Sequence, residues 1–105
     1  MSDTTSSKSK RMRNKAVGNI NWTEEGWRDY LFWQESDRKK CKKINKLITA
    51  ILRNPHDGEG KPEPLTHQLS GYWSRRIDQE HRLVYKYDEQ SETVTILQCR
   101  YHYDK

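Results

Sequence analysis

Residues 72–87 read Tyr-Trp-Ser-Arg-Arg-Ile-Asp-Gln-Glu-His-Arg-Leu-Val-Tyr-Lys-Tyr. Two runs rich in aromatic and β-branched residues, 72–77 and 82–87, flank a short polar link, which is the pattern of a β-hairpin. A third run of this kind spans 93–103, after a second polar turn at 88–91. Because strands joined by short links are usually neighbours, we expect three antiparallel strands in the carboxyl-terminal part of the chain.

The first of two helices expected upstream begins after Thr23, whose hydroxyl can accept a hydrogen bond at the helix N-terminus. Glu24 and Glu25 place negative charge near the positive end of the helix dipole. Helical spacing predicts the buried face of this helix to carry Trp27, Tyr30, Leu31 and Gln34. Ser36 and Asp37 then provide a break and a new cap.

The second helix is expected from Arg38 to about Arg53, before the stop at Asn54–Pro55. Its apolar stripe consists of Cys41, Ile44, Ile48, Ile51 and Leu52. Lysine and arginine fill the rest, which indicates a solvated face or, alternatively, a surface that contacts RNA. Two helices followed by strands predict an α+β fold, with both helices packed on one face of a small antiparallel β-sheet.

Length and charge divide the chain into a short tail and one domain. The chain has 105 residues and a net charge of +5, of which residues 1–15 carry +4 and residues 16–105 only +1. We expect 1–15 to be a flexible basic tail, either an arm that touches RNA or an inert extension. Residues 16–105 hold all four Trp and all six Tyr, which can supply the core of one folded domain.

The sequence lacks an apolar run of the roughly 20 residues needed to cross a bilayer, and it lacks a secretory signal. We therefore expect a cytoplasmic protein without membrane contact, in which Cys41 and Cys99 are reduced. Cys99 and His102 have the spacing of some metal ligands, but no second pair accompanies them. The sequence thus predicts no metal and no cofactor.

The segment Gly60-Lys61-Pro62-Glu63-Pro64-Leu65 places a carboxylate between two prolines. Both rings fix φ, and Pro64 keeps Glu63 out of helical conformations. Such a stiff mount suits a catalytic base that must be aimed before substrate arrives. The alternative is an ordinary surface acid in a proline-containing loop.

Three arginines, Arg75, Arg76 and Arg82, lie on the two strands of the predicted hairpin. Neighbouring strands lie about 4.8 Å apart, so these guanidiniums can converge on one phosphate. Nearby aromatics that could stack on bases are Tyr72, Trp73 and Tyr85. The alternatives are that the aromatics form core and that the arginines pair with nearby carboxylates.

The chain nears its end with Arg100-Tyr101-His102-Tyr103. If the last strand continues through this segment, Arg100 and His102 share one face. His102 can exchange a proton near neutral pH. A base at Glu63, cations at Arg82 and Arg76 and an acid at His102 are what RNA cleavage by its own 2′-hydroxyl requires.

Several motifs, in one order over one domain, closely resemble YoeB toxins of the RelE superfamily. They are Trp27-x-x-Tyr30, Lys42-Lys43-Ile44-Asn45, the segment 60–65, Leu69-Ser70-Gly71-Tyr72-Trp73-Ser74-Arg75-Arg76-Ile77, His81-Arg82-Leu83-Val84-Tyr85 and Cys99-Arg100-Tyr101-His102-Tyr103. The resemblance runs from about Asn19 to Tyr103. Residues 1–15 and Asp104–Lys105 lie outside the family pattern.

The resemblance implies a toxin of a bacterial type II toxin–antitoxin pair that cleaves mRNA in the ribosomal A site without a metal. It implies Glu63 as general base, His102 as general acid and Arg82 as stabiliser of the transition state. Tyr103 would help to position the catalytic residues near the end of the chain, and Arg76 would bind RNA. Further candidates for RNA contact are Lys61 and Arg75.

The resemblance also implies partners. A YefM-like antitoxin would cover the catalytic residues at the carboxyl terminus, the toxin could pair with itself, and DNA would be contacted only through the antitoxin. Two alternatives remain open at this point: a non-catalytic module that binds RNA or the ribosome and blocks translation, and a corepressor.

Overall fold

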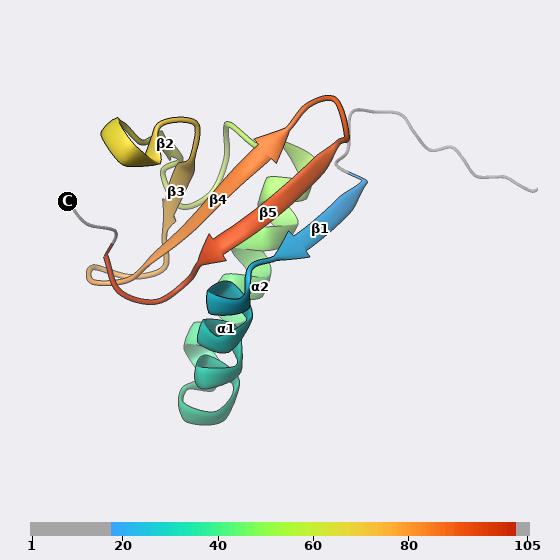
Figure 1. The fold of residues 1–105 in the computed structure, drawn as a ribbon. Coiled ribbons are helices and arrows are strands. Elements are labelled where there is room, and N and C mark those ends of the chain that lie inside the picture. The colour runs from blue at the N-terminus through green and yellow to red at the C-terminus, as the bar shows by residue number, and fades with distance from the viewer. Residues whose placement is uncertain (1–17, 103–105) are drawn as a thin grey trace, which may run out of the picture.

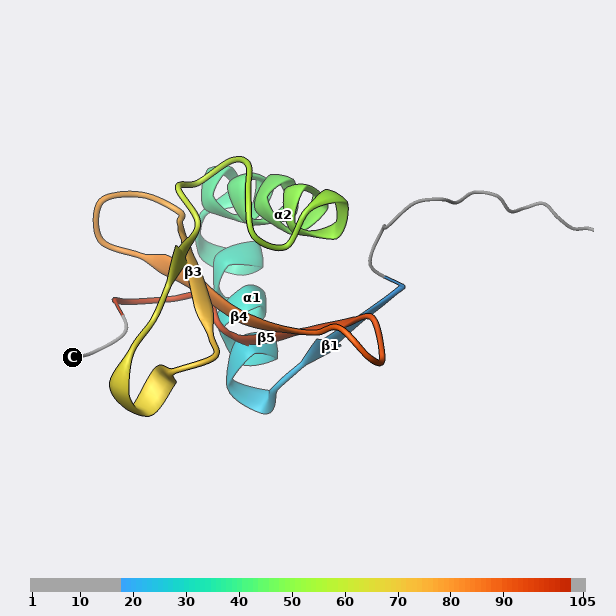
Figure 2. The same cartoon turned by 90° about the horizontal axis from the view of Figure 1, so that it is seen from above.

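The computed structural model describes residues 18–102, and in this part a five-stranded sheet packs against two helices (Figures 1 and 2). The elements in chain order are β1 (Asn19–Trp22), α1 (Glu24–Ser36), α2 (Arg38–Arg53), β2 (Glu63–Pro64), a 3₁₀ turn η1 (His67–Leu69), β3 (Trp73–Arg76), β4 (Arg82–Asp88) and β5 (Thr93–Gln98). The predicted α+β class and both predicted helices are confirmed. The predicted tail, 1–15, lies outside the described residues.

The sheet is mixed rather than antiparallel. Its strand order is β1-β5-β4-β3-β2, and β1 pairs with β5 in parallel. The three strands expected from the sequence pair antiparallel as predicted. The amino-terminal strand was missed as a sheet member because its partner is more than 70 residues away, and β2 because two residues form no sequence pattern.

The last strand ends earlier than the sequence predicted. Strand β5 stops at Gln98, and Tyr103 lies outside the described residues. The cause is Cys99, whose N–H donates to the Asp29 carboxylate and whose carbonyl accepts from the Trp33 indole. Helix α1 therefore binds the backbone polar groups that would otherwise extend the sheet, and the strand alternation expected beyond Cys99 does not apply to residues 100–102.

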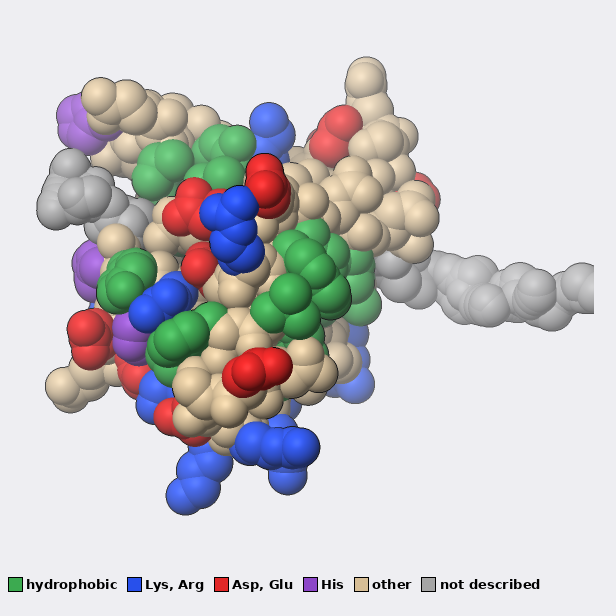
Figure 3. Space-filling model, turned by 60° about the horizontal axis from the view of Figure 1, so that its bottom comes forward, with side chains coloured by type: hydrophobic (Ala, Val, Ile, Leu, Met, Phe, Trp, Pro, Cys, Tyr) green, Lys and Arg blue, Asp and Glu red, His purple; other side chains and the backbone are tan. Residues whose placement is uncertain are grey.

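The buried face of α1 differs from the prediction. Trp33, Gly26 and Asp29 are buried, whereas Trp27 and Leu31 are exposed. Gly26 explains this orientation, because an added Cβ would come within 2.6 Å of the Ile96 carbonyl oxygen. The helix approaches β5 through its smallest residue. Trp27 and Leu31 are instead among the exposed large hydrophobic residues, and Figure 3 shows hydrophobic side chains at the surface on the lower side of the molecule.

Most of the buried hydrophobic side chains that the helices contribute to the core come from α2. Its buried residues are Ile44, Leu47, Ile48 and Ile51, and they pack with Leu83, Tyr85, Val94 and Ile96 of the sheet. The predicted stripe is confirmed for its three isoleucines, whereas Cys41 and Leu52 are half-buried. Its basic face is exposed or paired with acids, as in the contact between Lys43 and Glu59.

Both cysteines are free, and burial raises the pKa of the Cys99 thiol. In residues 18–102, no helix is both long and apolar enough to cross a membrane.

Thr23 joins the first helix to the sheet. Its hydroxyl accepts from the Gly26 N–H at 3.0 Å and donates to the Leu97 carbonyl at 2.8 Å. We expect Thr23→Ala to lower the free energy of unfolding by about 2 kcal/mol, since it removes a helix cap and a hydrogen bond to β5. Urea denaturation measures the change. Thr23→Ser keeps the hydroxyl and should lose less than half as much, and equal losses would show that the methyl group matters instead.

Candidate active site

Strand β2 holds the predicted base at the edge of the sheet. Glu63 pairs with Ser74 of β3, and its side chain is exposed. The segment enters β2 through Gly60, with φ +89°, and Lys61, with φ +53°. An added Cβ at Gly60 would lie 2.7 Å from Leu47, so only glycine fits this turn. The backbone of Glu63 is thus restrained by its pairing with β3 and by the prolines on either side of it in the sequence.

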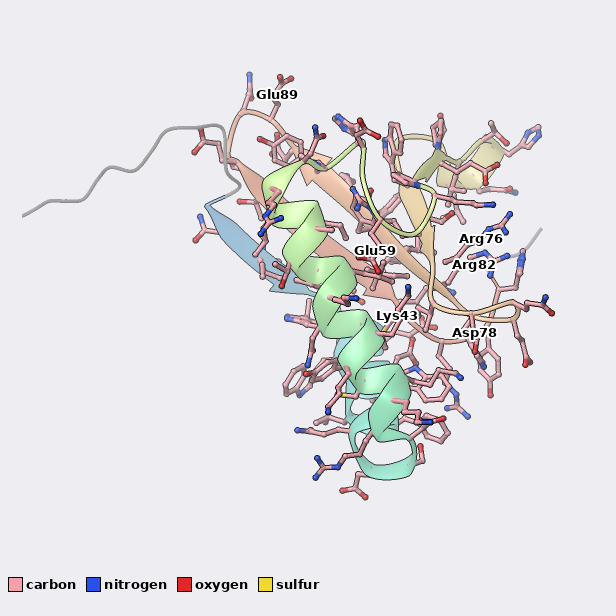
Figure 4. The ribbon with its side chains drawn as sticks, turned by 180° about the vertical axis from the view of Figure 1, so that it is seen from behind. Lys43, Glu59, Arg76, Asp78, Arg82 and Glu89 are labelled. Atoms are coloured by element: carbon pink, nitrogen blue, oxygen red, sulfur yellow. The ribbon has the colours of Figure 1, made fainter. Side chains whose placement is uncertain are left out.

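Two of the predicted arginines form a direct cross-strand pair. Arg76 of β3 lies opposite Arg82 of β4. The Arg76 N–H donates to the Gly60 carbonyl and the Arg82 N–H to the Tyr101 carbonyl, so neither N–H bonds to the opposing arginine. In such a pair the Cα atoms are only about 4.5 Å apart. The two side chains therefore leave the sheet side by side, as Figure 4 shows.

The register puts Glu63 and the arginine pair on one sheet face. Residues directly opposite one another share a face, and so do residues two apart along a strand. Glu63 is opposite Ser74, and Ser74 is two residues from Arg76. Glu63 and Arg76 are thus diagonal neighbours, for which Cα atoms lie roughly 7–8 Å apart and Cβ atoms somewhat closer.

The carboxyl-terminal segment, residues 99–102, returns to the start of β4. The Tyr101 N–H donates to His81 Nδ1 at 2.6 Å, and the Tyr101 carbonyl accepts from the Arg82 N–H at 3.0 Å. His102 follows directly and is exposed. The predicted acid is therefore attached beside Arg82, whereas Tyr103 lies outside the described residues.

Arg82 is also bound through its side chain. Its Nη1 donates to the carbonyls of Asp78 and His81 at 2.8 and 3.1 Å, and to that of Gln79 at 3.3 Å. All three belong to the turn between β3 and β4. The guanidinium is thus oriented by its own hairpin before any ligand is present.

Lys61 lies close to the arginine pair. It lines a shallow pocket of about 390 Å³ that is also lined by Lys43, Arg76 and Asp78. Lys43 binds Glu59 at 3.2 Å, and this hydrogen bond lowers the pKa of the Glu59 carboxyl. Lys61 can therefore contribute to the same positive surface as Arg76.

Arg75 is placed differently from the prediction. Its side chain is fully buried and cannot meet RNA from this position. Nε donates to the Tyr85 hydroxyl, and the two terminal nitrogens donate to the carbonyls of Asn54, Asp57 and Glu59. The physical reason is strand alternation: if Arg76 faces outward with Arg82, Arg75 must face the helices. Of the predicted stacking residues, Tyr85 is buried, and Tyr72 and Trp73 are half-buried.

Sequence analysis missed two residues that hold the site together. His81 accepts from Tyr101, and Asp29 accepts from Cys99 at 3.0 Å. Burial raises the pKa of the Asp29 carboxyl, although the Cys99 N–H partly opposes this shift. The only signal for His81 was its position directly before Arg82, and nothing in the sequence linked Asp29 to residue 99. In the described part of the chain, no cluster of three or more His, Cys, Asp or Glu could hold a metal ion.

Residues 22–103 match the family described as "YoeB-like toxin of bacterial type II toxin-antitoxin system". The chain belongs to the YoeB-like toxin family. The toxin YoeB of Escherichia coli K12 is 58% identical over 82 residues, which are 78% of this chain and 95% of that protein.

Solved structures agree with the family. A "YoeB/ParE toxin from Agrobacterium tumefaciens" superposes with a TM-score of 0.80 at 46% identity, covering 82% of this chain and all of that one. A YoeB-YefM complex from Staphylococcus aureus gives 0.74 at 45%, covering 81% and 97%. A YoeB dimer from the same organism gives 0.75 at 46%, covering 84% and 100%. The RelE-like α+β fold expected from the resemblance is confirmed.

Arg75 and Arg76 form a matched pair for a stability measurement. We expect Arg75→Lys to lower the free energy of unfolding by about 2–3 kcal/mol, because an ammonium cannot reach the carbonyls that the guanidinium fork binds. Arg76→Lys, at an exposed neighbour, should change it by less than about 0.5 kcal/mol. Urea denaturation of both variants measures this, and equal small losses would mean that the buried network contributes little.

Asp29 predicts a specific dependence of stability on pH. Its folded-state pKa is raised, so its contribution to stability is greatest in acid and is lost as pH rises through that pKa. Asp29→Asn keeps an oxygen for the Cys99 N–H but cannot ionise. We expect the melting temperature, relative to that of the unaltered protein, to rise between about pH 4 and pH 7. Glu35→Gln, at an exposed position of α1, is the control, and an identical trend in both variants would contradict the assignment.

Proposed function

We propose that this YoeB-like toxin is an endoribonuclease that cleaves mRNA in the ribosomal A site by general acid–base catalysis, without a metal or other cofactor. The observation that carries the proposal is the shared sheet face of Glu63, Arg76 and Arg82, together with the backbone bond that attaches the segment before His102 to Arg82. In this proposal a base, two cations and an acid act on one phosphodiester.

The chemistry assigns each group a step. Glu63 removes the proton from a ribose 2′-hydroxyl, and the 2′-oxygen attacks the adjacent phosphorus. Arg82 and Arg76 stabilise the negative charge that grows on the phosphate oxygens. His102 in its protonated form donates to the 5′-oxygen as the bond to phosphorus breaks. The products are a 2′,3′-cyclic phosphate, or the 3′-phosphate derived from it, and a 5′-hydroxyl. Tyr103 helps to position the catalytic residues near the end of the chain, and Lys61 binds the RNA strand.

Arg75 is left out of this assignment. Its guanidinium supports the loop 54–59, so we propose a structural role for it in place of RNA contact.

The proposed partners follow from the relatives. Because a S. aureus YoeB occurs in complex with YefM and as a dimer, we propose a YefM-like antitoxin and a homodimer for this chain. Contact with DNA would pass only through the antitoxin. We propose a cytoplasmic location, because the proposed substrate is ribosome-bound mRNA.

Primer extension on ribosome-bound message tests the activity. Glu63→Gln and His102→Gln remove the base and the acid, and we expect each to slow cleavage by about 10²–10⁴-fold. Thermal melts should match those of the unaltered protein, because both side chains are exposed. As a control for a metal bound by the toxin itself, the toxin is treated with EDTA, and the EDTA is removed before ribosomes with their own Mg²⁺ are added. We expect cleavage to be unchanged.

Two results would contradict the proposal. Full cleavage by either variant would remove that residue from its assigned role. Arrested translation with uncut message would identify a non-catalytic block of the ribosome instead.

A further inference from the structure

His81 is buried between the first helix and the carboxyl-terminal segment. Only 9% of the residue is exposed, and its ring packs edge-on against Trp33 with centroids 4.8 Å apart. Its Nδ1 accepts the Tyr101 N–H at 2.6 Å. A ring nitrogen that accepts a hydrogen bond carries no proton, so this hydrogen bond requires an unprotonated Nδ1, with the ring proton on Nε2.

Tyr101 needs this support because its backbone is unusual. Its φ of +64° lies in the left-handed region, which a bulky residue adopts only when its surroundings impose it. Its N–H donates to His81 Nδ1, and its carbonyl accepts from the N–H of Arg82, the residue that follows His81. The last residue of the β3–β4 turn, His81, and the first residue of β4, Arg82, thus bind both backbone polar groups of Tyr101 and fix where His102 begins.

We propose that His81 is a positioning residue: its neutral Nδ1 holds the carboxyl-terminal segment against β4 and thereby places His102 beside Arg82 for RNA cleavage. Its catalytic consequence rests on the proposed function, whereas the hydrogen bond itself does not. His81 never touches the RNA in this scheme. It acts through the backbone of Tyr101.

Protonation of His81 opens this contact. A second ring proton would occupy Nδ1, so the Tyr101 N–H would face another N–H. The Glu80 carboxylate lies 3.8 Å from Nε2, and Asp78, which accepts the His81 backbone N–H, is bound to Lys40 of α2. Arg82 Nη1 donates to the His81 carbonyl, and the Arg100 guanidinium stacks over the neighbouring Tyr101 ring. A proton on Nδ1 should therefore release Tyr101 and His102 from the start of β4 while the sheet persists.

Two variants separate the acceptor from the ring. His81→Phe keeps an aromatic ring against Trp33 but removes the acceptor, whereas His81→Asn supplies an oxygen near the position of Nδ1. We expect the Tyr101 amide hydrogen to exchange at least about tenfold faster in His81→Phe, and kcat for cleavage of ribosome-bound mRNA to fall roughly 10–100-fold with little change in KM. His81→Asn should restore both to within about threefold.

A pH titration of the unaltered protein gives a readout independent of both variants and of activity. The ¹⁵N signals of the His81 ring report its protonation, and amide exchange, corrected for its intrinsic pH dependence, reports the Tyr101 bond. We expect protection at Tyr101 to disappear as Nδ1 gains its proton, while amides of β4 stay protected.

The outcomes distinguish this inference from the proposed function. Protection at Tyr101 that survives protonation of Nδ1, or a folded His81→Phe that keeps both protection and kcat, would overturn the role of His81. An unaltered protein that leaves message uncut but shows the titration would overturn the nuclease and leave the backbone grip in place. If His81→Phe fails to fold, the titration and His81→Asn decide the question.

Discussion

The arrangement of the candidate site depends on the hydrogen bonds of the buried Arg75 guanidinium. This guanidinium lies at the carboxyl end of α2, where unpaired helix carbonyls and the helix dipole favour a positive charge. It binds the carbonyls of Asn54, Asp57 and Glu59 and the hydroxyl of Tyr85. Carbonyl dipoles thus offset much of the cost of burying the charge. The loop that leads to Glu63 is thereby fixed to the sheet.

The arrangement of the candidate site follows from this loop and from one hairpin register. Gly60 ends the supported loop, and its carbonyl accepts from Arg76, which sets β2 against β3. The pairing of Arg76 with Arg82 then carries the same order to β4, where Arg82 takes up the carboxyl-terminal segment. Glu63 and His102 are therefore positioned from opposite sides of one pair of strands. A register slip of one residue would turn the arginines to the wrong face.

Local patterns predicted α2 and the hairpin, because spacing and turn residues act over short distances. They did not predict the parallel pairing of β1 with β5, which requires contacts far apart in sequence. For the site, residue types indicated Glu63, Arg76 and Arg82, but Arg75 was assigned to RNA because the pattern does not reveal which of two adjacent arginines faces the helices. Strand alternation does exclude that both share a face with Arg82.

Two like charges placed opposite each other on a sheet destabilise the folded state, and Arg76 and Arg82 are such a pair. Residues 16–105 carry a net charge of only +1, so attraction for a polyanion depends on this local concentration and not on total charge. Three turn carbonyls bind Arg82 and offset part of the repulsion. A phosphate that binds between the guanidiniums would remove the remainder. The strain at this pair is thus relieved by the ligand that the site is proposed to take, which favours binding at this position over binding at isolated surface lysines.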